Sequence, residues 1–307
     1  MNVLENDSLW LADLSYLGVL RVSGQDRRGF LQGQLTQNLD HLSPEQSILS
    51  GWTSPKGRLL AISQLFDWQD SIWMLMPADL IDGIAKRLTM YVLRSDVRLE
   101  TCRISVTGLR GTKAIAATEA LGMTLINEPN ASASTENVCI GRVAGDPSRL
   151  VALGDLSGFP TPAVKKRGSV AWRLLNIRSG IPTIFPATAE SFVPQMVNLD
   201  LCGGVSFTKG CYTGQEIVAR TQNLGRVKRR MFRFTDATGT KLAPGQAIFF
   251  TERPAGQVVD AVSDGTGTEL LAVVPLNLGD NNLYLDESAT LRLDPAAMPY
   301  KVRGLTG

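Results

Sequence analysis

The sequence predicts a mixed α+β protein that ends in a small all-β domain. Segments with helical and with strand periodicity alternate up to about residue 225, and only short strands separated by Gly, Pro and Asp follow. A chain of 307 residues is also long enough for two or three domains. We therefore expect a bilobal α+β region over residues 1–225, with sub-segments of about 1–100 and 101–225, and a barrel-like β domain over 226–307.

The first sub-segment alternates between the two periodicities. Its predicted elements are a strand over 16–24, a helix over 26–39, a hairpin around the turn 55–57, a strand over 71–77 and a helix over 78–94. The last helix has the clearest pattern, because its apolar residues at 80, 81, 84, 88, 91 and 92 have helical spacing.

The second sub-segment repeats this texture with shorter elements. The polar, turn-rich stretch 127–137 indicates an exposed loop, and the basic residues 165–167 indicate a solvated turn before a helix. Strands and helices are expected in the stretches 97–108, 112–122, 137–145, 149–154 and 169–180. The strands of the β domain are expected at 229–236, 246–250, 256–263, 269–275 and 289–293.

Composition excludes several classes of protein. The net charge of +2 is too small to indicate a nucleic-acid or membrane partner. The four cysteines form no C-x-x-C pair and the only histidine is His41, which argues against a self-contained zinc or iron–sulfur site. We interpret Cys102, Cys139 and Cys202 as core residues. The start of the chain has no signal-peptide pattern, and no apolar run approaches the ~20 residues of a spanning helix, so we expect a soluble, cytoplasmic protein with reduced thiols.

Residues 206–225, SFTKGCYTGQEIVARTQNLG, predict a short helix that begins just after a cysteine. Thr213 and Glu216 have the spacing of a capping box, with Thr213 as the N-cap. Tyr212 and Ile217 have the spacing of the hydrophobic staple that accompanies such a box.

Cys211 lies just before this helix, in the loop that follows a predicted strand over 203–207. Free backbone N–H groups and the positive end of the helix dipole lie at such a position, and Lys209 adds a cation. These influences favour the thiolate, which is the reactive and metal-binding form of cysteine. Gly210 and Gly214 allow a ligand to approach the backbone closely. A second interpretation stays open, in which Cys211 is a small buried residue in a well-capped turn.

The motif KGCYTGQEIVAR at 209–220 resembles the signature of the YgfZ family of folate-binding proteins, which are relatives of the glycine cleavage T-protein aminomethyltransferases. Further blocks that look like those of the family follow the same order along the chain. They are FLQGQLTQNL at 30–39, SPKGRLLA at 54–61, NIRSGIP at 176–182 and FVPQMVNLDLCGGVSF at 192–207. With the C-terminal β segment, the resemblance covers nearly the whole chain.

The resemblance implies both a fold and a role. The implied fold is an α+β, T-protein-like ring of two intertwined ferredoxin-like segments plus a small C-terminal β-barrel, with a central cleft for tetrahydrofolate. The implied role is the assembly or maintenance of iron–sulfur enzymes, including radical enzymes that thiomethylate tRNA. The resemblance also implies that Cys211 is the functional residue and that Trp172 helps to bind folate.

Two departures from the aminomethyltransferases bear on activity. Those enzymes carry an acidic pair after a turn like PKGRLL, where this chain has Ala61 and Ile62. Neither side chain can accept a proton, so glycine-cleavage activity is not expected. A glutamate that holds the pterin in the transferases is replaced by Arg178, which only donates hydrogen bonds and is instead a candidate partner for the glutamate tail of folate.

The candidate site residues follow from the motif and the resemblance together. Trp172 has an alternative role as a core anchor. Gln195 and Asn198 have one as caps of a turn, and Arg220 has one as a charge near a helix C-terminus. No metal site is expected, apart from Cys211 as a transient cluster ligand. The candidate catalytic residues are Cys211 and Lys209, and the candidate folate-binding residues are Trp172, Arg178, Gln195, Asn198, Tyr212, Gln215, Glu216 and Arg220.

The leading hypothesis is a tetrahydrofolate-binding accessory protein whose partners are iron–sulfur enzymes or cluster-assembly proteins. An alternative is a folate-dependent one-carbon transferase or demethylase that uses Cys211. A third is an RNA-binding module, because GRVKRRMFRF at 225–234 interleaves basic and aromatic residues, including Arg229 and Arg233. The same strip also fits a strand with Met and Phe toward the core and Arg toward water.

Overall fold

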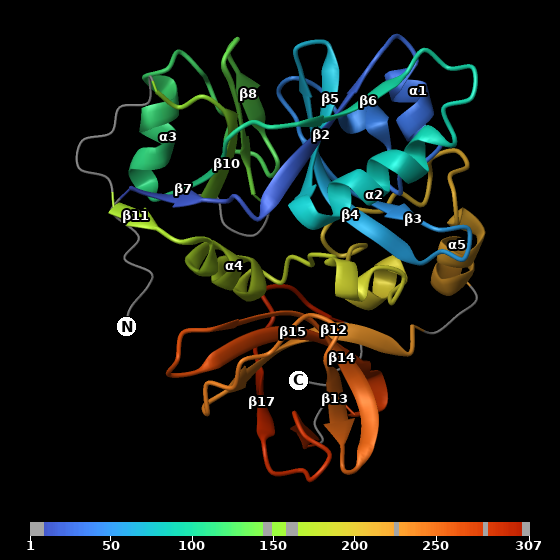
Figure 1. Cartoon of the computed structure of the whole chain (residues 1–307), viewed down its shortest axis with the longest axis vertical. Coiled ribbons are helices and arrows are strands. Elements are labelled where there is room, and N and C mark those ends of the chain that lie inside the picture. The colour runs from blue at the N-terminus through green and yellow to red at the C-terminus, as the bar shows by residue number, and fades with distance from the viewer. Residues whose placement is uncertain (1–8, 144–148, 158–164, 224–226, 279–281, 303–307) are drawn as a thin grey trace. The chain divides into compact units, whose positions relative to one another are not determined.

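The described residues form a six-stranded sheet, a five-stranded sheet and a closed six-stranded barrel (Figure 1). The class is α+β with few helices, as the sequence predicts. The chain divides into two compact units: the first unit comprises residues 1–50 and 63–172, and the second unit comprises residues 51–62 and 173–307. The computed structural model describes residues 9–143, 149–157, 165–223, 227–278 and 282–302.

The six-stranded sheet belongs to the first unit and has the order β11-β1-β7-β10-β9-β8. Strand β1 pairs in parallel with β11, and the other neighbours are antiparallel. Helix α3 (Thr112–Glu119) lies beside this sheet (Figure 1). Its Ala114 packs with Leu109 and Leu150 in one apolar cluster. The strands are β1 (Trp10–Asp13), β7 (Val106–Arg110), β8 (Ser132–Ser134), β9 (Val138–Arg142), β10 (Arg149–Gly154) and β11 (Lys165–Arg167).

The five-stranded sheet has the order β3-β4-β5-β2-β6. Helix α2 (Ala78–Thr89) packs closely on β2, because a Cβ atom at Gly18 would lie 2.5 Å from Cδ1 of Ile81. The shorter helix α1 (Arg27–Gln32) buries Phe30 and Leu31. The strands are β2 (Leu17–Ser23), β3 (Ile48–Thr53), β4 (Leu59–Trp68), β5 (Ser71–Pro77) and β6 (Arg98–Cys102).

The barrel belongs to the second unit and encloses its own apolar core. Alternate residues of β12, Phe232 and Phe234, pack inward with Ile248 and Leu270. Its strands are β12 (Arg229–Asp236), β13 (Ala247–Phe250), β14 (Arg253–Ser263), β15 (Thr268–Pro275), β16 (Leu283–Tyr284) and β17 (Arg292–Ala296). The barrel thus falls within the predicted β domain, while the predicted domain boundary at residue 225 stays a prediction.

The helices of the rest of the chain are short. Helix α4 (Ser169–Arg178) carries Trp172, and α5 (Gln215–Asn223) follows the cysteine motif. The 3₁₀ turns are η1 (Leu39–His41), η2 (Pro186–Thr188), η3 (Pro194–Val197) and η4 (Leu276–Leu278).

Several local predictions are wrong. The helix expected over 26–39 ends at Gln32. The strand expected over 203–207 is absent, because residues 198–203 form a series of turns that closes with the hydrogen bond from the N–H of Gly204 to the carbonyl of Leu199. The expected loop over 127–137 contains β8, and the expected turn over 165–167 is strand β11. Both are three-residue edge strands, which are too short to show a period of two in the sequence.

Candidate functional site

The loop that carries Cys211 turns Lys209 and Tyr212 inward and Cys211 outward. Lys209 and Tyr212 are buried, with 9% and 7% of their surface exposed, whereas Cys211 is exposed. The ammonium of Lys209 lies 5.2 Å from the ring centroid of Tyr212, which is the geometry of a cation–π contact. The hydroxyl of Ser206 accepts hydrogen bonds from the backbone N–H groups of Thr208 and Lys209, at 3.4 and 3.2 Å. The alternative interpretation of Cys211 as a buried residue is therefore wrong.

Helix α5 begins one residue later than the capping box predicts. The carbonyl of Gly214 accepts the first helical hydrogen bond, from the N–H of Val218 at 3.4 Å, so Gly214 and not Thr213 is the N-cap. The carboxylate of Glu216 instead meets Arg220 one turn later, at 3.1 Å, on the exposed face of the helix. The predicted helix start is therefore one residue too early, and the capping contacts of Thr213 stay a prediction. Gly214 has a φ of +80°, a conformation that residues with a side chain rarely adopt. The chain therefore bends at Gly214, where it enters α5.

The cysteine motif contacts the turn at residues 54–57, which belongs to the same unit. A Cβ atom at Gly214 would lie 2.4 Å from the carbonyl oxygen of Ser54 and 3.0 Å from the Cα atom of Gly57. The hydroxyl of Thr53 donates a hydrogen bond to the carbonyl of Thr213 at 2.5 Å. The two sequence blocks SPKG and KGCYTGQE are therefore one packed substructure, although about 150 residues separate them.

Gln195 and Asn198 are fully buried and bonded to the protein. The amide nitrogen of Gln195 donates to the carbonyl of Val218 in α5 at 2.8 Å. The amide nitrogen of Asn198 donates to the carbonyl of Met231 in β12 at 2.7 Å. Both side chains thus tie the η3 turn to neighbouring elements of the second unit, and their predicted contact with a pterin stays a prediction.

Arg178, at the end of α4, is paired with Glu269 of β15. Its Nε atom lies 2.9 and 3.1 Å from the two carboxylate oxygens, and a terminal nitrogen makes a third contact. A guanidinium held in this forked arrangement is already matched to a carboxylate. Its predicted role toward the glutamate tail of folate stays a prediction.

Trp172 belongs to the first unit and is only 2% exposed. Its ring packs edge-on against Trp10, with centroids 6.3 Å apart, and the guanidinium of Arg149 lies 5.0 Å from its centroid. The ring also lies against the backbone of Gly108, where a Cβ atom would approach it to 2.5 Å. These are the contacts of a core anchor, and its predicted role in folate binding stays a prediction.

Ala61 and Ile62 are buried in β4, with 1% and 5% of their surface exposed.

The basic strip overlaps barrel strand β12, in which side chains alternate between the two faces. Arg229 is exposed, whereas Arg230 is buried and forms two hydrogen bonds with Asp200, at 2.7 and 2.9 Å. Arg230 is thus bonded within the protein. This pairing gives no support to a contact between Arg230 and RNA.

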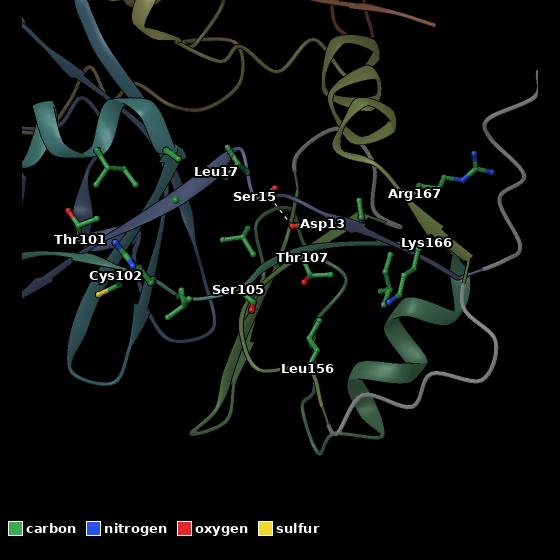
Figure 2. Close-up of a pocket in the computed structure, with 18 of the residues that line it drawn as sticks. Asp13, Ser15, Leu17, Thr101, Cys102, Ser105, Thr107, Leu156, Lys166 and Arg167 are labelled. Carbon is green, nitrogen blue, oxygen red and sulfur yellow. Dashed lines mark hydrogen bonds between the residues drawn. The ribbon is translucent and has the colours of Figure 1, made fainter.

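A groove of about 880 Å³ lies in the first unit (Figure 2). Figure 2 shows Asp13, Ser105 and Thr107 in its middle, with Cys102 and Lys166 toward opposite sides. None of the predicted site residues is among the residues that line it. Sequence reasoning missed this groove because its lining comes from the ends of several elements, which share no motif.

The remaining thiols differ in environment. Cys102 is half-buried beside the groove, which corrects its interpretation as a core residue, and burial raises its pKa. Cys139 is buried as predicted, and burial raises its pKa to about 12. Cys202 is partly exposed, which corrects the same interpretation for this residue, and burial raises its pKa to about 11. Within the described ranges, His, Cys, Asp and Glu side chains form no group of three that could hold a metal ion.

Comparisons with known proteins show which family the chain belongs to. The chain is 30% identical over 226 residues to the tRNA-modifying protein YgfZ of Hamiltonella defensa, a match that covers 71% of this chain and 67% of that protein. The chain belongs to the YgfZ family. It is also 28% identical over 309 residues to the tRNA-modifying protein YgfZ of Yersinia pestis, with 96% of this chain and 93% of that protein covered. No family model matches the sequence.

The fold of this YgfZ family member is that of a T-protein. The crystal structure of the glycine cleavage system aminomethyltransferase T from Bartonella henselae matches 97% of this chain and 88% of its own, with a TM-score of 0.70 and 16% identity. The fold predicted from the family resemblance is thus confirmed. None of the helices in the described part of the chain has both the length and the hydropathy that crossing a bilayer requires.

Proposed function

We propose that this YgfZ family member is a tetrahydrofolate-binding accessory protein for the assembly or maintenance of iron–sulfur clusters, which indirectly supports tRNA modification by radical iron–sulfur enzymes. Cys211 is its functional thiol. The observation that carries the proposal is the outward position of Cys211 in a loop whose Lys209 and Tyr212 are buried. The name of its relatives, tRNA-modifying protein YgfZ, and its T-protein fold support the same role.

A single exposed thiol suits an accessory role better than a resident metal centre. Stable iron–sulfur clusters in proteins are held by several cysteine thiolates, and the described residues offer no such set around Cys211. Cys211 would therefore act on a cluster only together with ligands from a client protein, or would act on a bound folate. Either chemistry requires that the sulfur be accessible, which the loop provides.

The face of α5 next to Cys211 has the chemistry that a folate requires. The side chains of Glu216 and Arg220 are 82% and 62% exposed. A carboxylate accepts hydrogen bonds from a pterin, and a guanidinium pairs with the carboxylates of a glutamate tail. Folate contacts with Arg178, Gln195 or Asn198 would have to replace partly or fully buried hydrogen bonds within the protein. Glu216 and Arg220 bond only to each other in an exposed pair, which costs little to open. We therefore propose Gln215, Glu216 and Arg220 as the first folate contacts to test.

The role of the thiol is tested in cells that lack the natural gene. Cells that produce the Cys211→Ala variant should contain much less thiomethylated adenosine in their tRNA than cells that produce the parent protein, as measured by mass spectrometry of digested tRNA. Cys102→Ala is the matched control, because it removes another partly accessible thiol and should leave the modification unchanged. Normal modification with Cys211→Ala, at equal protein level, would refute the functional thiol.

Folate binding is tested separately by calorimetric titration of the purified protein with 5-formyltetrahydrofolate. We expect saturable binding that weakens by about tenfold in Arg220→Ala, since the change removes one charge-assisted contact. Arg229→Ala is the matched control, because it removes an equal charge at an exposed position outside the motif. Absence of binding by the parent protein would reject the folate part of the proposal and leave the thiol part standing.

A further inference from the structure

The turn at residues 54–57 is held by its own hydrogen bonds. The N–H of Ser54 donates to the carbonyl of Arg58, and the N–H of Gly57 donates to the carbonyl of Ser54, each at 2.8 Å. Pro55 follows Ser54, where its fixed φ favours a tight turn. Gly57 ends the turn with a φ of +67°. A turn held at both ends in this way can act as a fixed support.

This support meets the cysteine motif by backbone contact, which leaves little room for adjustment. Ile217 of α5 lies directly over Gly57, so that a Cβ atom on the glycine would lie 2.7 Å from the Cβ atom of Ile217. Gly214 in turn lies against Ser54, as described above. Two glycines, each with a positive φ, are therefore what allow the two segments to approach so closely.

One side-chain hydrogen bond joins the two segments. Thr53, which is fully buried at the end of β3, donates its hydroxyl proton to the carbonyl of Thr213. That carbonyl belongs to the peptide unit that links Thr213 to Gly214, two residues beyond Cys211. The bond fixes the orientation of this peptide, and hence the direction in which the chain leaves Cys211 and enters α5.

We propose that Thr53 is a positioning residue for Cys211. Through its hydroxyl it holds the cysteine loop against the 54–57 turn, so that the exposed side chain of Cys211 keeps its outward position, where a reagent or ligand can reach the sulfur. The proposal rests on the proposed function, in which Cys211 is the functional thiol. It adds a residue from a distant sequence block that touches neither thiol nor ligand.

The test measures the alkylation rate of Cys211 by iodoacetamide at fixed pH, for the whole folded protein. Trypsin releases Cys211 in the peptide Gly210–Arg220, so mass spectrometry separates its rate from those of the other cysteines. Thr53→Val removes the hydroxyl and keeps the shape, and it should slow alkylation about two- to tenfold, the factor that corresponds to one net hydrogen bond. Thr53→Ser restores the donor and should restore the rate.

Thr221→Val is the matched control. It removes a hydroxyl that donates to the carbonyl of Ile217 at 2.8 Å, within the same helix but without contact to the turn, and should leave the rate of Cys211 unchanged. Should Thr53→Val fail to fold, Ile217→Ala loosens the same contact from the partly exposed side and should slow alkylation in the same way.

An unchanged rate in Thr53→Val, or a slow rate that Thr53→Ser does not restore, overturns the positioning role. The proposed function fails by a different result, namely normal tRNA thiomethylation with Cys211→Ala. A slow, serine-rescued alkylation together with normal tRNA would support the positioning role and reject the function of the thiol.

Discussion

Arg178 and Glu269 form a forked ion pair that joins helix α4 to strand β15 of the barrel. Both side chains are partly buried, at 31% and 18% exposure, and both belong to the second unit. The basic residue that the sequence offers as a partner for the tail of folate thus contacts a carboxylate of the protein itself.

The pair should contribute to stability. We expect Arg178→Ala to lower the free energy of unfolding by about 2 kcal/mol, because it removes charge-assisted hydrogen bonds and leaves Glu269 unpaired. Urea unfolding followed by circular dichroism measures this loss. Arg220→Ala, which breaks the exposed pair with Glu216, should change stability by less than about 0.5 kcal/mol. Equal effects of the two changes would contradict the structural role of Arg178.

The contact between the two glycines should not tolerate a side chain. Gly57→Ala places a methyl group 2.7 Å from Ile217 at a positive φ, and we expect a loss of about 2 kcal/mol or more in unfolding free energy. Gly210→Ala is the control in the same motif, because nothing lies within 4 Å of its added Cβ atom. A stable Gly57→Ala protein, measured by thermal unfolding, would show that the turn does not hold α5 so closely.

Stability should fall in alkaline solution. The pKa of Cys139 rises from 9.0 to about 12 on folding, so between these values the unfolded chain loses a proton that the folded chain keeps. The stabilisation is complete below pH 9 and is lost as the pH rises toward 12, at most by about 1.4 kcal/mol per pH unit. Cys139→Ala should make the free energy of unfolding fall less steeply with pH, because the contribution of this thiol is removed. Urea titrations at several pH values from 7 to about 10.5 measure it, and an identical slope in the variant would contradict the assignment.

Gly108 should be required for the packing of Trp172. A methyl group at this position would approach the indole ring to 2.5 Å, so Gly108→Ala should displace the ring and cost about 1–3 kcal/mol. The displacement should also change the intrinsic tryptophan fluorescence. Gly141→Ala provides a comparison in the same sheet, since there the added atom meets Phe66 and no tryptophan. A fluorescence change of equal size in both variants would argue against a specific contact.

Thiol reagents should distinguish the cysteines of the folded protein. We expect Cys211 to react first and Cys102 second, because these are exposed and half-buried, and Cys139 to react only after unfolding. Time-resolved alkylation followed by peptide mass spectrometry gives the order. Early labelling of Cys139 would mean that the sheet opens locally.

The fold was predictable where a long pattern determines it. The helix at 78–94 and the strands of the barrel have enough consecutive periodic residues for the pattern to stand out. The structure places the closed barrel there and α2 over Ala78–Thr89, so the helix ends five residues earlier than predicted. Short elements were not predictable. Strands β8 and β11 have three residues each, and pairing with a neighbour, rather than their own sequence, makes them strands.

The site was predictable as a motif but not as a geometry. The sequence singled out Cys211 and Lys209 together, yet only the structure shows that one side chain points outward and the other inward. The helix start was misplaced by one residue because Thr213 and Glu216 match a capping box, while close packing against Ser54 places the bend at Gly214. Contacts between segments 150 residues apart leave no mark on either sequence block alone.

The assignment of residues 51–62 to the second unit has a consequence for synthesis of the protein on the ribosome. This hairpin emerges early, but its partners are residues 173 and beyond, so it must wait for more than a hundred further residues before its contacts can form. A nascent chain that stops at residue 172 therefore lacks the contacts that residues 51–62 make with the rest of the second unit, and that unit completes its packing only late in synthesis.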